Sequence, residues 1–218
     1  MFADRRHAGR LLAERLQAFA AERPVVVALP RGGVPVGFEV AQALGTPLDI
    51  LAVRKLGAPG NREFAVGAIV EDGTALLDRA TARRVGLTSK ALDDTVAAEA
   101  RELTRQVARY RGERGGVDVR GRTAIIVDDG LATGLTDLAA VRALRSLGAE
   151  RVIVAVPVGV SDSLTRVAQD ADDVICHTVP AELISVGSWY EDFTPVSDDE
   201  VVELLDAAAA AYATRAAR

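Results

Sequence analysis

Two neighbouring aspartates, Asp128 and Asp129, follow a short apolar run in residues 125–136 (IIVDDGLATGLT), and a turn of small residues comes directly after them. We expect this turn, from Thr133 to Thr136, to open a helix, whose unpaired N–H groups and dipole attract an anion such as phosphate. The two carboxylates cannot serve the same phosphate, because like charges repel. They must face hydrogen-bond donors or a metal ion, such as vicinal sugar hydroxyls or Mg²⁺. The segment therefore predicts a pocket for a 5-phosphorylated ribose.

Three other interpretations of this segment are weaker. The structural alternative is a strand, an Asx-rich turn and a helix that bind no ligand. A Walker-type phosphate loop is excluded, because the chain has no Gly-Lys-Ser or Gly-Lys-Thr triplet. A Rossmann dinucleotide site is disfavoured, because the glycine spacing is absent and the acids precede the turn.

The run VDDGLATGLT resembles the loop that binds 5-phosphoribosyl diphosphate (PRPP) in type I phosphoribosyltransferases. The resemblance implies that Asp128 and Asp129 are catalytic and hold the ribose 2′ and 3′ hydroxyls. It also implies that the following turn binds the 5-phosphate through Ala132, Thr133, Gly134, Leu135 and Thr136. Some members of the family carry a third carboxylate where this chain has Ala132, so the loop supplies no general acid or base.

A second segment, VVVALPRGGVPVG (25–37), places Arg31, Gly32 and Gly33 between an apolar strand and a helix start. In the family this loop binds pyrophosphate through backbone N–H groups, often with a cis peptide that is not X–Pro. The glycines permit the required backbone angles and the close approach of an anion. Arg31 is predicted to be catalytic, because its guanidinium can fork onto phosphate oxygens.

A third segment, RKLGAPGNRE (54–63), is predicted to be a loop from its glycines, proline and asparagine. It resembles the mobile loop that closes over pyrophosphate in this family. Lys55 is predicted to be catalytic and Arg54 to bind PRPP, because the two cations would neutralise the leaving group. Glu63 has no assigned partner.

A fourth segment, ISVGSWYEDFTP (184–195), is similar to the hood that covers the acceptor base near the C-terminus of these enzymes. Trp189 or Tyr190 is the expected stacking platform, and Asp192 is expected to meet Mg²⁺ or a ring substituent. The alternative is that these aromatics belong to the core.

The N-terminal run FADRRHAGRLLA (2–13) resembles the start of an uncharacterised bacterial branch of the family. Asp4, Arg5 and Arg6 belong to the hood or to a dimer contact, and the sequence does not choose between the two.

Short apolar runs alternate with helical segments in the way that parallel βαβ units do. We therefore expect one domain over residues 1–218, with a Rossmann-like parallel sheet flanked by helices, a helical excursion at 80–112 and a hood at 180–196. Expected strands cover 25–29, 48–53 and 172–179, residues 123–159 form a βαβ unit, and 65–78 form a hairpin. Expected helices cover 8–22, 34–45 and 197–218. Ser89 is expected to open a long helix that ends near Tyr110, with an apolar stripe at Leu92, Val96, Leu103 and Val107.

Composition narrows the function classes. Of the 218 residues 49% are hydrophobic and 26% charged, and 26 Lys and Arg against 31 Asp and Glu give a net charge of −5. The missing basic surplus disfavours nucleic acid. The absence of an apolar run of about 18 residues disfavours a membrane protein, and we see no signal peptide. A single cysteine, Cys176, makes the reducing cytoplasm the expected location.

Together these features predict a Mg²⁺-dependent enzyme that transfers a phosphoribosyl group from PRPP to a nitrogenous acceptor, a nucleobase or related heterocycle, and releases pyrophosphate. The alternative is a regulator that senses PRPP on the same fold without turning it over. A related sugar-phosphate enzyme that performs phosphorolysis or hydrolysis is a third possibility. The resemblance also implies a possible homodimer, whereas the identity of the acceptor is not predicted.

Overall fold

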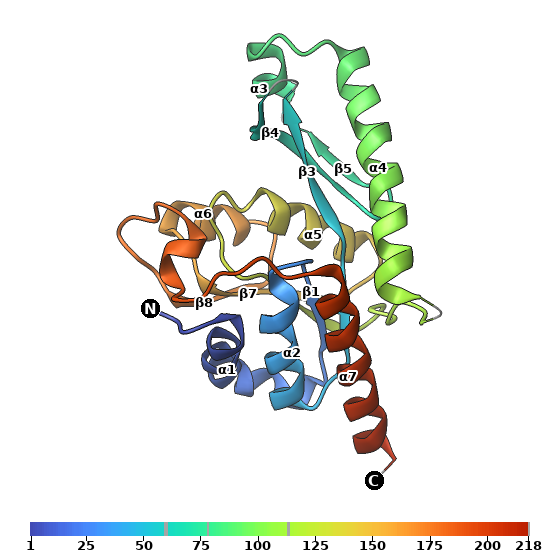
Figure 1. Cartoon of the computed structure of the whole chain (residues 1–218), viewed down its shortest axis with the longest axis vertical. Coiled ribbons are helices and arrows are strands. Elements are labelled where there is room, and N and C mark those ends of the chain that lie inside the picture. The colour runs from blue at the N-terminus through green and yellow to red at the C-terminus, as the bar shows by residue number, and fades with distance from the viewer. Residues whose placement is uncertain (59–60, 78, 113, 218) are drawn as a thin grey trace.

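The computed structural model describes residues 1–58, 61–77, 79–112 and 114–217. Its main sheet has five parallel strands (Figure 1). In sheet order they are β2 (Leu48–Ile50), β1 (Val25–Ala28), β6 (Thr123–Val127), β7 (Arg151–Val158) and β8 (Asp173–Thr178). β1 and β6, which carry the two predicted phosphate loops, are direct neighbours, with Val27 opposite Ile126. The predicted parallel α/β fold is confirmed.

Alternate residues of each strand feed two separate cores, because successive side chains of a strand point to opposite faces. In β6, Ile125 and Val127 pack on one face, and Ala124 and Ile126 on the other. The first face is covered by α1 (Arg5–Leu16), α2 (Gly33–Leu44) and α7 (Asp198–Ala216). The second is covered by α5 (Leu135–Ser146) and α6 (Ser161–Val167). Both faces of the sheet are thus buried, as continuous apolar strands require.

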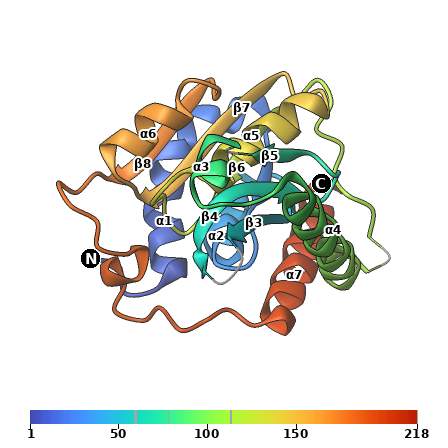
Figure 2. The same ribbon diagram turned by 90° about the horizontal axis from the view of Figure 1, so that it is seen from above.

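Residues 53–58, 61–77 and 79–112 form an arm that projects from the sheet (Figure 1). It contains an antiparallel sheet, in the order β3 (Val53–Ala58), β4 (Asn61–Val70) and β5 (Ala75–Leu77), and the helices α3 (Arg79–Arg84) and α4 (Ser89–Arg111). Seen from above, β3 and β4 lie between α5 and α4, and α4 lies beside α7 (Figure 2). The arm therefore contacts helices on both faces of the main sheet, α5 on one face and α7 on the other.

One prediction about the arm needs correction. The loop predicted at 54–63 is wrong where the structure describes it, because residues 53–58 and 61–70 are paired strands. The helices α3 and α4 lie where the helical excursion is predicted, and the sheet of β3, β4 and β5 precedes them in the arm. The predicted hairpin at 65–78 is confirmed by the pairing of β4 with β5. The long helix is also confirmed as α4, which is capped by Thr88, whose Oγ1 accepts the Ala91 N–H at 3.2 Å.

The chain ends are organised by helix caps and a short turn. The predicted helix at 8–22 begins earlier, at Arg5, because the Asp4 carboxylate caps it by accepting the His7 N–H at 2.6 Å. α1 is followed by the 3₁₀ helix η1 (Gln17–Glu22). The predicted hood contains one 3₁₀ turn, η2 (Val186–Trp189), and leads into α7. None of the helices in the described part of the chain combines the length and apolar character needed to cross a bilayer.

Candidate active site

The acid pair lies where β6 ends, at the carboxyl edge of the sheet. Asp128 Oδ1 accepts the N–H of Asp129 at 2.8 Å, and Asp129 Oδ2 accepts the Arg5 Nε–H at 2.9 Å. Burial, and then the charges of Asp129 and Asp137, raise the pKa of Asp128 well above its ordinary range. Burial also raises the pKa of Asp129, although the Arg5 guanidinium opposes the rise. Carboxylates held this way bind well to ligand groups that donate hydrogen bonds.

Gly32 and Gly33 let the loop after β1 press against the acid pair. A Cβ on Gly32 would lie 1.9 Å from Asp129 Oδ2, and one on Gly33 would lie 2.5 Å from the Val127 carbonyl oxygen. A side chain at Gly33 would collide with the backbone, and one at Gly32 would displace the Asp129 carboxylate, so the two loops at the ends of β1 and β6 pack closely together. The peptide bond between Pro30 and Arg31 is cis, as the resemblance implies for this loop.

The predicted phosphate turn opens α5, with Gly134 as N-cap at φ +72°, an angle that favours glycine. The turn is held from α6 through its carbonyl groups. Ser163 Oγ donates to the Ala132 carbonyl at 2.6 Å, and Arg166 Nη1 donates to the Thr133 carbonyl at 3.4 Å. The first N–H groups of a helix have no partner within the helix, so the start of α5 can bind an anion.

Asp137, in the same first turn of α5, is a third acid that sequence reasoning missed. It is only 2% exposed, and its Oδ1 has no hydrogen-bond partner among the described residues. Burial raises its pKa to about 6. An acid in the first turn of a helix is usual, so its spacing gave no signal. Only its burial beside the other two carboxylates makes it unusual.

Strand alternation in β3 separates the two cations that the sequence pairs. Val53 packs with the core beneath α5, and Leu56 packs with the opposite core. Lys55 shares the face of Val53, and its charge lowers the pKa of the three site acids against the effect of burial. Arg54 points to the other face, where its Nε–H donates to Glu99 Oε2 of α4. Lys55 therefore faces the acid pair, and Arg54 faces α4.

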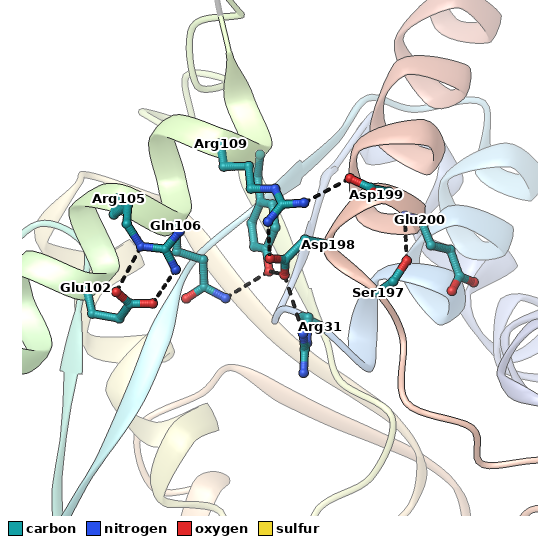
Figure 3. A network of polar contacts seen from close by, with 10 residues as sticks. Arg31, Glu102, Arg105, Gln106, Arg109, Ser197, Asp198, Asp199 and Glu200 are labelled. Carbon is teal, nitrogen blue, oxygen red and sulfur yellow. Dashed lines mark hydrogen bonds and ion pairs between the residues drawn. The ribbon is translucent and has the colours of Figure 1, made fainter.

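Arg31 belongs to a polar network that joins the loop after β1 to α4 and α7 (Figure 3). Arg31 Nη1 lies 3.4 Å from Asp198 Oδ1, which also accepts the Tyr110 hydroxyl at 2.6 Å. Arg109 donates to Asp198 at 2.7 Å and to Asp199 at 2.9 Å. The Tyr110 hydrogen bond comes first among the causes that lower the pKa of Asp198. Asp198 is the centre of this network.

The network borders a polar cavity of about 300 Å³ between the loop after β1, β3, α4 and α7. Arginine supplies much of its wall, although these guanidiniums have carboxylate partners. The cavity is lined by Pro30, Arg31, Val53, Arg54, Glu102, Arg105, Gln106, Arg109 and Asp198.

The hood is bonded to the N-terminal residues. The Phe2 N–H donates to the Trp189 carbonyl at 2.8 Å, and the Phe2 carbonyl accepts the Glu191 N–H at 2.8 Å. The Asp192 N–H donates to the Ala3 carbonyl at 2.9 Å. Phe2 and Ala3 therefore lie against the hood, and Arg5 reaches it through the Thr194 carbonyl, whereas Arg6 contacts Glu39 of α2.

Tyr190 is a core residue of the hood. It is 6% exposed, and its ring centroid lies 5.3 Å from that of Phe2 and 5.0 Å from that of Phe193. Its hydroxyl donates to the Asp129 carbonyl at 2.6 Å. The prediction of Tyr190 as a stacking platform is therefore corrected, because both its ring and its hydroxyl are already in use. Trp189, which is half-buried, stays the predicted platform.

Asp192 is exposed and faces away from this packing. Its Oδ1 accepts the Thr194 N–H at 2.9 Å and the Thr194 hydroxyl at 2.6 Å, and these bonds lower its pKa. It lines a cavity of about 340 Å³ with the N-terminal segment and the first turn of α2. No group of three or more His, Cys, Asp or Glu side chains forms a metal-binding cluster in the part of the chain that is described.

A family model for the phosphoribosyl transferase domain matches residues 3–199. The chain belongs to this family. Two proteins of Mycobacterium tuberculosis, from strains CDC 1551 / Oshkosh and ATCC 25618 / H37Rv, are each named provisionally as a phosphoribosyl transferase and are 48% identical to it over 208 residues. The match covers 95% of this chain and 47% of each relative, so the chain spans about half the length of these curated relatives.

A solved structure extends the likeness to three dimensions. The crystal structure of TT1426 from Thermus thermophilus matches with a TM-score of 0.80 at 42% sequence identity, covering 94% of this chain and 97% of that chain. The match includes nearly the whole fold described above.

In this phosphoribosyl transferase domain, the carboxyl edge of β1 and β6 gathers most of the predicted site. The acid pair, the two glycines, the turn at 133–136 and Lys55 converge there, whereas Arg54 and Asp192 point elsewhere. Sequence reasoning left the role of Arg5 open and missed that of Asp137. For Arg5 the only signal was its place in the family-like N-terminal run, since its contact with Asp129 spans 124 positions.

Proposed function

We propose that this domain transfers the phosphoribosyl group of PRPP to a nitrogenous acceptor, a nucleobase or related heterocycle, and releases pyrophosphate. One observation carries the proposal. The partly buried acid pair lies between a glycine loop packed against it and the N-terminus of α5. This arrangement offers carboxylates to sugar hydroxyls and amides to a phosphate, side by side.

The residues present would orient the sugar and stabilise the leaving charge. Asp128 and Asp129 would hold the ribose hydroxyls, and the turn at 133–136 would bind the 5-phosphate. The bond between ribose C1 and the pyrophosphate oxygen breaks as the acceptor nitrogen bonds to C1, and Lys55 and Arg31 balance the departing negative charge. Ala132 cannot take the proton that the acceptor loses, so that proton passes to solvent or to pyrophosphate.

The donor set also suits Mg²⁺. This ion is usually held by one or two carboxylates, with substrate phosphates and water completing its shell, so the acid pair fits an ion that arrives with PRPP. Asp128 or Asp129 would hold it from the protein side. When bound, Mg²⁺ would neutralise negative charge on pyrophosphate.

Two measurements on the intact chain test this function. Titration calorimetry with PRPP and Mg²⁺ measures binding, and we expect measurable heat. Incubation with PRPP, Mg²⁺ and a panel of bases and amines, followed by a pyrophosphate assay, measures transfer. Binding without pyrophosphate release under any acceptor would instead support a PRPP-sensing regulator. If neither heat nor pyrophosphate appears, the proposed function is wrong.

A further inference from the structure

Arg5 is a buried charge that no step of the proposed transfer uses. The residue is 9% exposed, at the start of α1. Its Nε–H donates to Asp129 Oδ2 at 2.9 Å, and its Nη1 donates to the Thr194 carbonyl at 3.0 Å. Its guanidinium carbon lies 3.8 Å from the ring centroid of Phe193. One planar cation thus joins a site acid, the hood backbone and an aromatic face, which is a task that arginine performs better than lysine.

Arg5 stabilises the negative charge of the Asp129 carboxylate and fixes its orientation. The Asp129 side chain is only 16% exposed, and an ionised carboxylate at such a depth is costly unless a partner compensates it. Arg5 engages Oδ2, and no hydrogen bond within the described residues uses Oδ1. The pair therefore leaves one oxygen of a fixed carboxylate available to a ligand.

The same carboxylate residue is tied to the hood by two routes. Arg5 connects its side chain to Thr194, and the Tyr190 hydroxyl bonds its main-chain carbonyl at 2.6 Å. The N-terminal residues that precede Arg5 are bonded to the hood as well. The acid and the hood consequently form one packed unit with the N-terminus.

We propose that Arg5 is a positioning residue for the sugar site: it fixes the Asp129 carboxylate toward the ribose and couples it to the acceptor hood. This inference rests on the proposed function and deepens it. It implies that a change in the hood that touches no sugar group still alters PRPP binding.

A purely structural role for Arg5 is distinguishable by a double-mutant cycle. If Arg5 acts through Asp129, the fold-losses of PRPP affinity in Arg5→Met and in Asp129→Asn should not multiply in the double variant. The double variant should bind PRPP within about threefold of Asp129→Asn. If Arg5 only supports the fold, the two losses should multiply.

The experiment measures the affinity for PRPP with Mg²⁺ by calorimetry, on variants checked for folding by circular dichroism. We expect Arg5→Met to weaken binding by about 10- to 100-fold, the range for a lost hydrogen bond to a charged group. Arg5→Lys should recover part of this loss, because the charge returns but the fork does not. Tyr190→Phe should weaken binding by a few-fold, because it frees the Asp129 carbonyl and leaves the aromatic packing intact.

Arg10→Met is the matched control, since Arg10 lies on the same helix with its side chain 57% exposed and 3.8 Å from Glu39. It should bind PRPP as the wild type does. A wild-type protein that binds no PRPP would overturn the proposed function. Suppose instead that the wild type binds PRPP. The role of Arg5 alone would then be overturned if Arg5→Met binds PRPP equally well, or if the fold-losses multiply in the cycle. If Arg5→Met does not fold, Arg5→Lys and Tyr190→Phe decide, and wild-type affinity in both would overturn the proposal.

Discussion

The carboxyl ends of β1 and β6, with the loops that follow them, form a corner of the main sheet. This corner and the arm both carry candidate ligand groups, but they hold them in different ways. In the corner, Asp128, Asp129 and the turn at 133–136 follow one another along the chain, directly after the fully buried strand β6. In the arm, Lys55 and Arg109 come from a strand and a helix more than 50 positions apart, and Arg109 is bound to two carboxylates.

This difference separates two kinds of functional residue. A contiguous motif on a buried parallel strand has its geometry fixed by the strand and by the helix that follows. A residue of the arm depends on the face of its strand and on ion pairs with distant segments. The corner is therefore expected to dominate ligand binding, and the arm to adjust it.

The largest expected effect comes from removing both corner acids. Asp128→Asn with Asp129→Asn keeps the side-chain shapes but removes two charges that would face the ribose. Single preorganised groups contribute about 3 kcal/mol to transition-state stabilisation, so we expect kcat/KM to fall at least about 1,000-fold, with no measurable PRPP binding by calorimetry. Asp94→Asn, at an exposed acid of α4, is the control and should leave both unchanged. Unchanged PRPP affinity in the double variant would remove the corner from the site.

The sequence predicted the local fold of the corner, and in the arm it predicted the hairpin and the long helix but missed the strand β3, for a physical reason. The βαβ unit at 123–159 and its loop follow from local pattern, because a buried strand and a capped helix are determined by nearby residues. Residues 54–63 have the composition of a loop, yet Val53–Leu56 pair with Gly67–Val70, and this pairing is a tertiary effect that composition does not reveal. Likewise, the aromatic cluster near Trp189 was recognised, but Phe2 from the other end of the chain determines that Tyr190 is buried.

The next effect in size is the pH dependence of the free energy of unfolding. For Asp137, in the corner, it has the opposite sign to that for Asp198, which contacts the arm. Burial raises the pKa of Asp137 to about 6 from an ordinary 3.8. The folded state then binds more protons than the unfolded state between these values, so the free energy of unfolding falls as pH rises from about 4 to about 6. Above pH 6 the cost reaches about 3 kcal/mol, at 1.36 kcal/mol per unit.

Asp137→Asn should remove this cost. Urea unfolding should find the variant more stable than the wild type at pH 7 and nearly equal to it at pH 4. Asp198→Asn should show the opposite sign, because the Tyr110 hydroxyl lowers the pKa of Asp198, so the wild type is favoured at pH 7 and loses that advantage as pH falls. A pH-independent difference for Asp137→Asn would contradict the buried-acid explanation.

A third prediction compares two adjacent cations within the arm. Lys55→Met should weaken PRPP binding by about tenfold, because it removes the charge that faces the corner acids and the leaving group. Arg54→Met should act mainly on thermal stability, because Arg54 faces Glu99 of α4. Calorimetry and thermal melting on both variants separate the two effects. If Arg54→Met weakens binding as much as Lys55→Met does, strand alternation does not decide which cation serves the site.

The smallest effect tests how the arm is fastened to the domain. Tyr110 is fully buried, and its hydroxyl donates to Asp198 at 2.6 Å, whereas Tyr212 on α7 is 39% exposed. Tyr110→Phe should lower the free energy of unfolding by about 1 to 2 kcal/mol, the range for a hydrogen bond to a charged group with other partners left. Tyr212→Phe, the matched control, should change it by less than about 0.5 kcal/mol. Arg31 also contacts Asp198. If Tyr110→Phe weakens PRPP binding by more free energy than it removes from stability, the arm affects the corner through this network. The contrast between the two regions would then be one of degree.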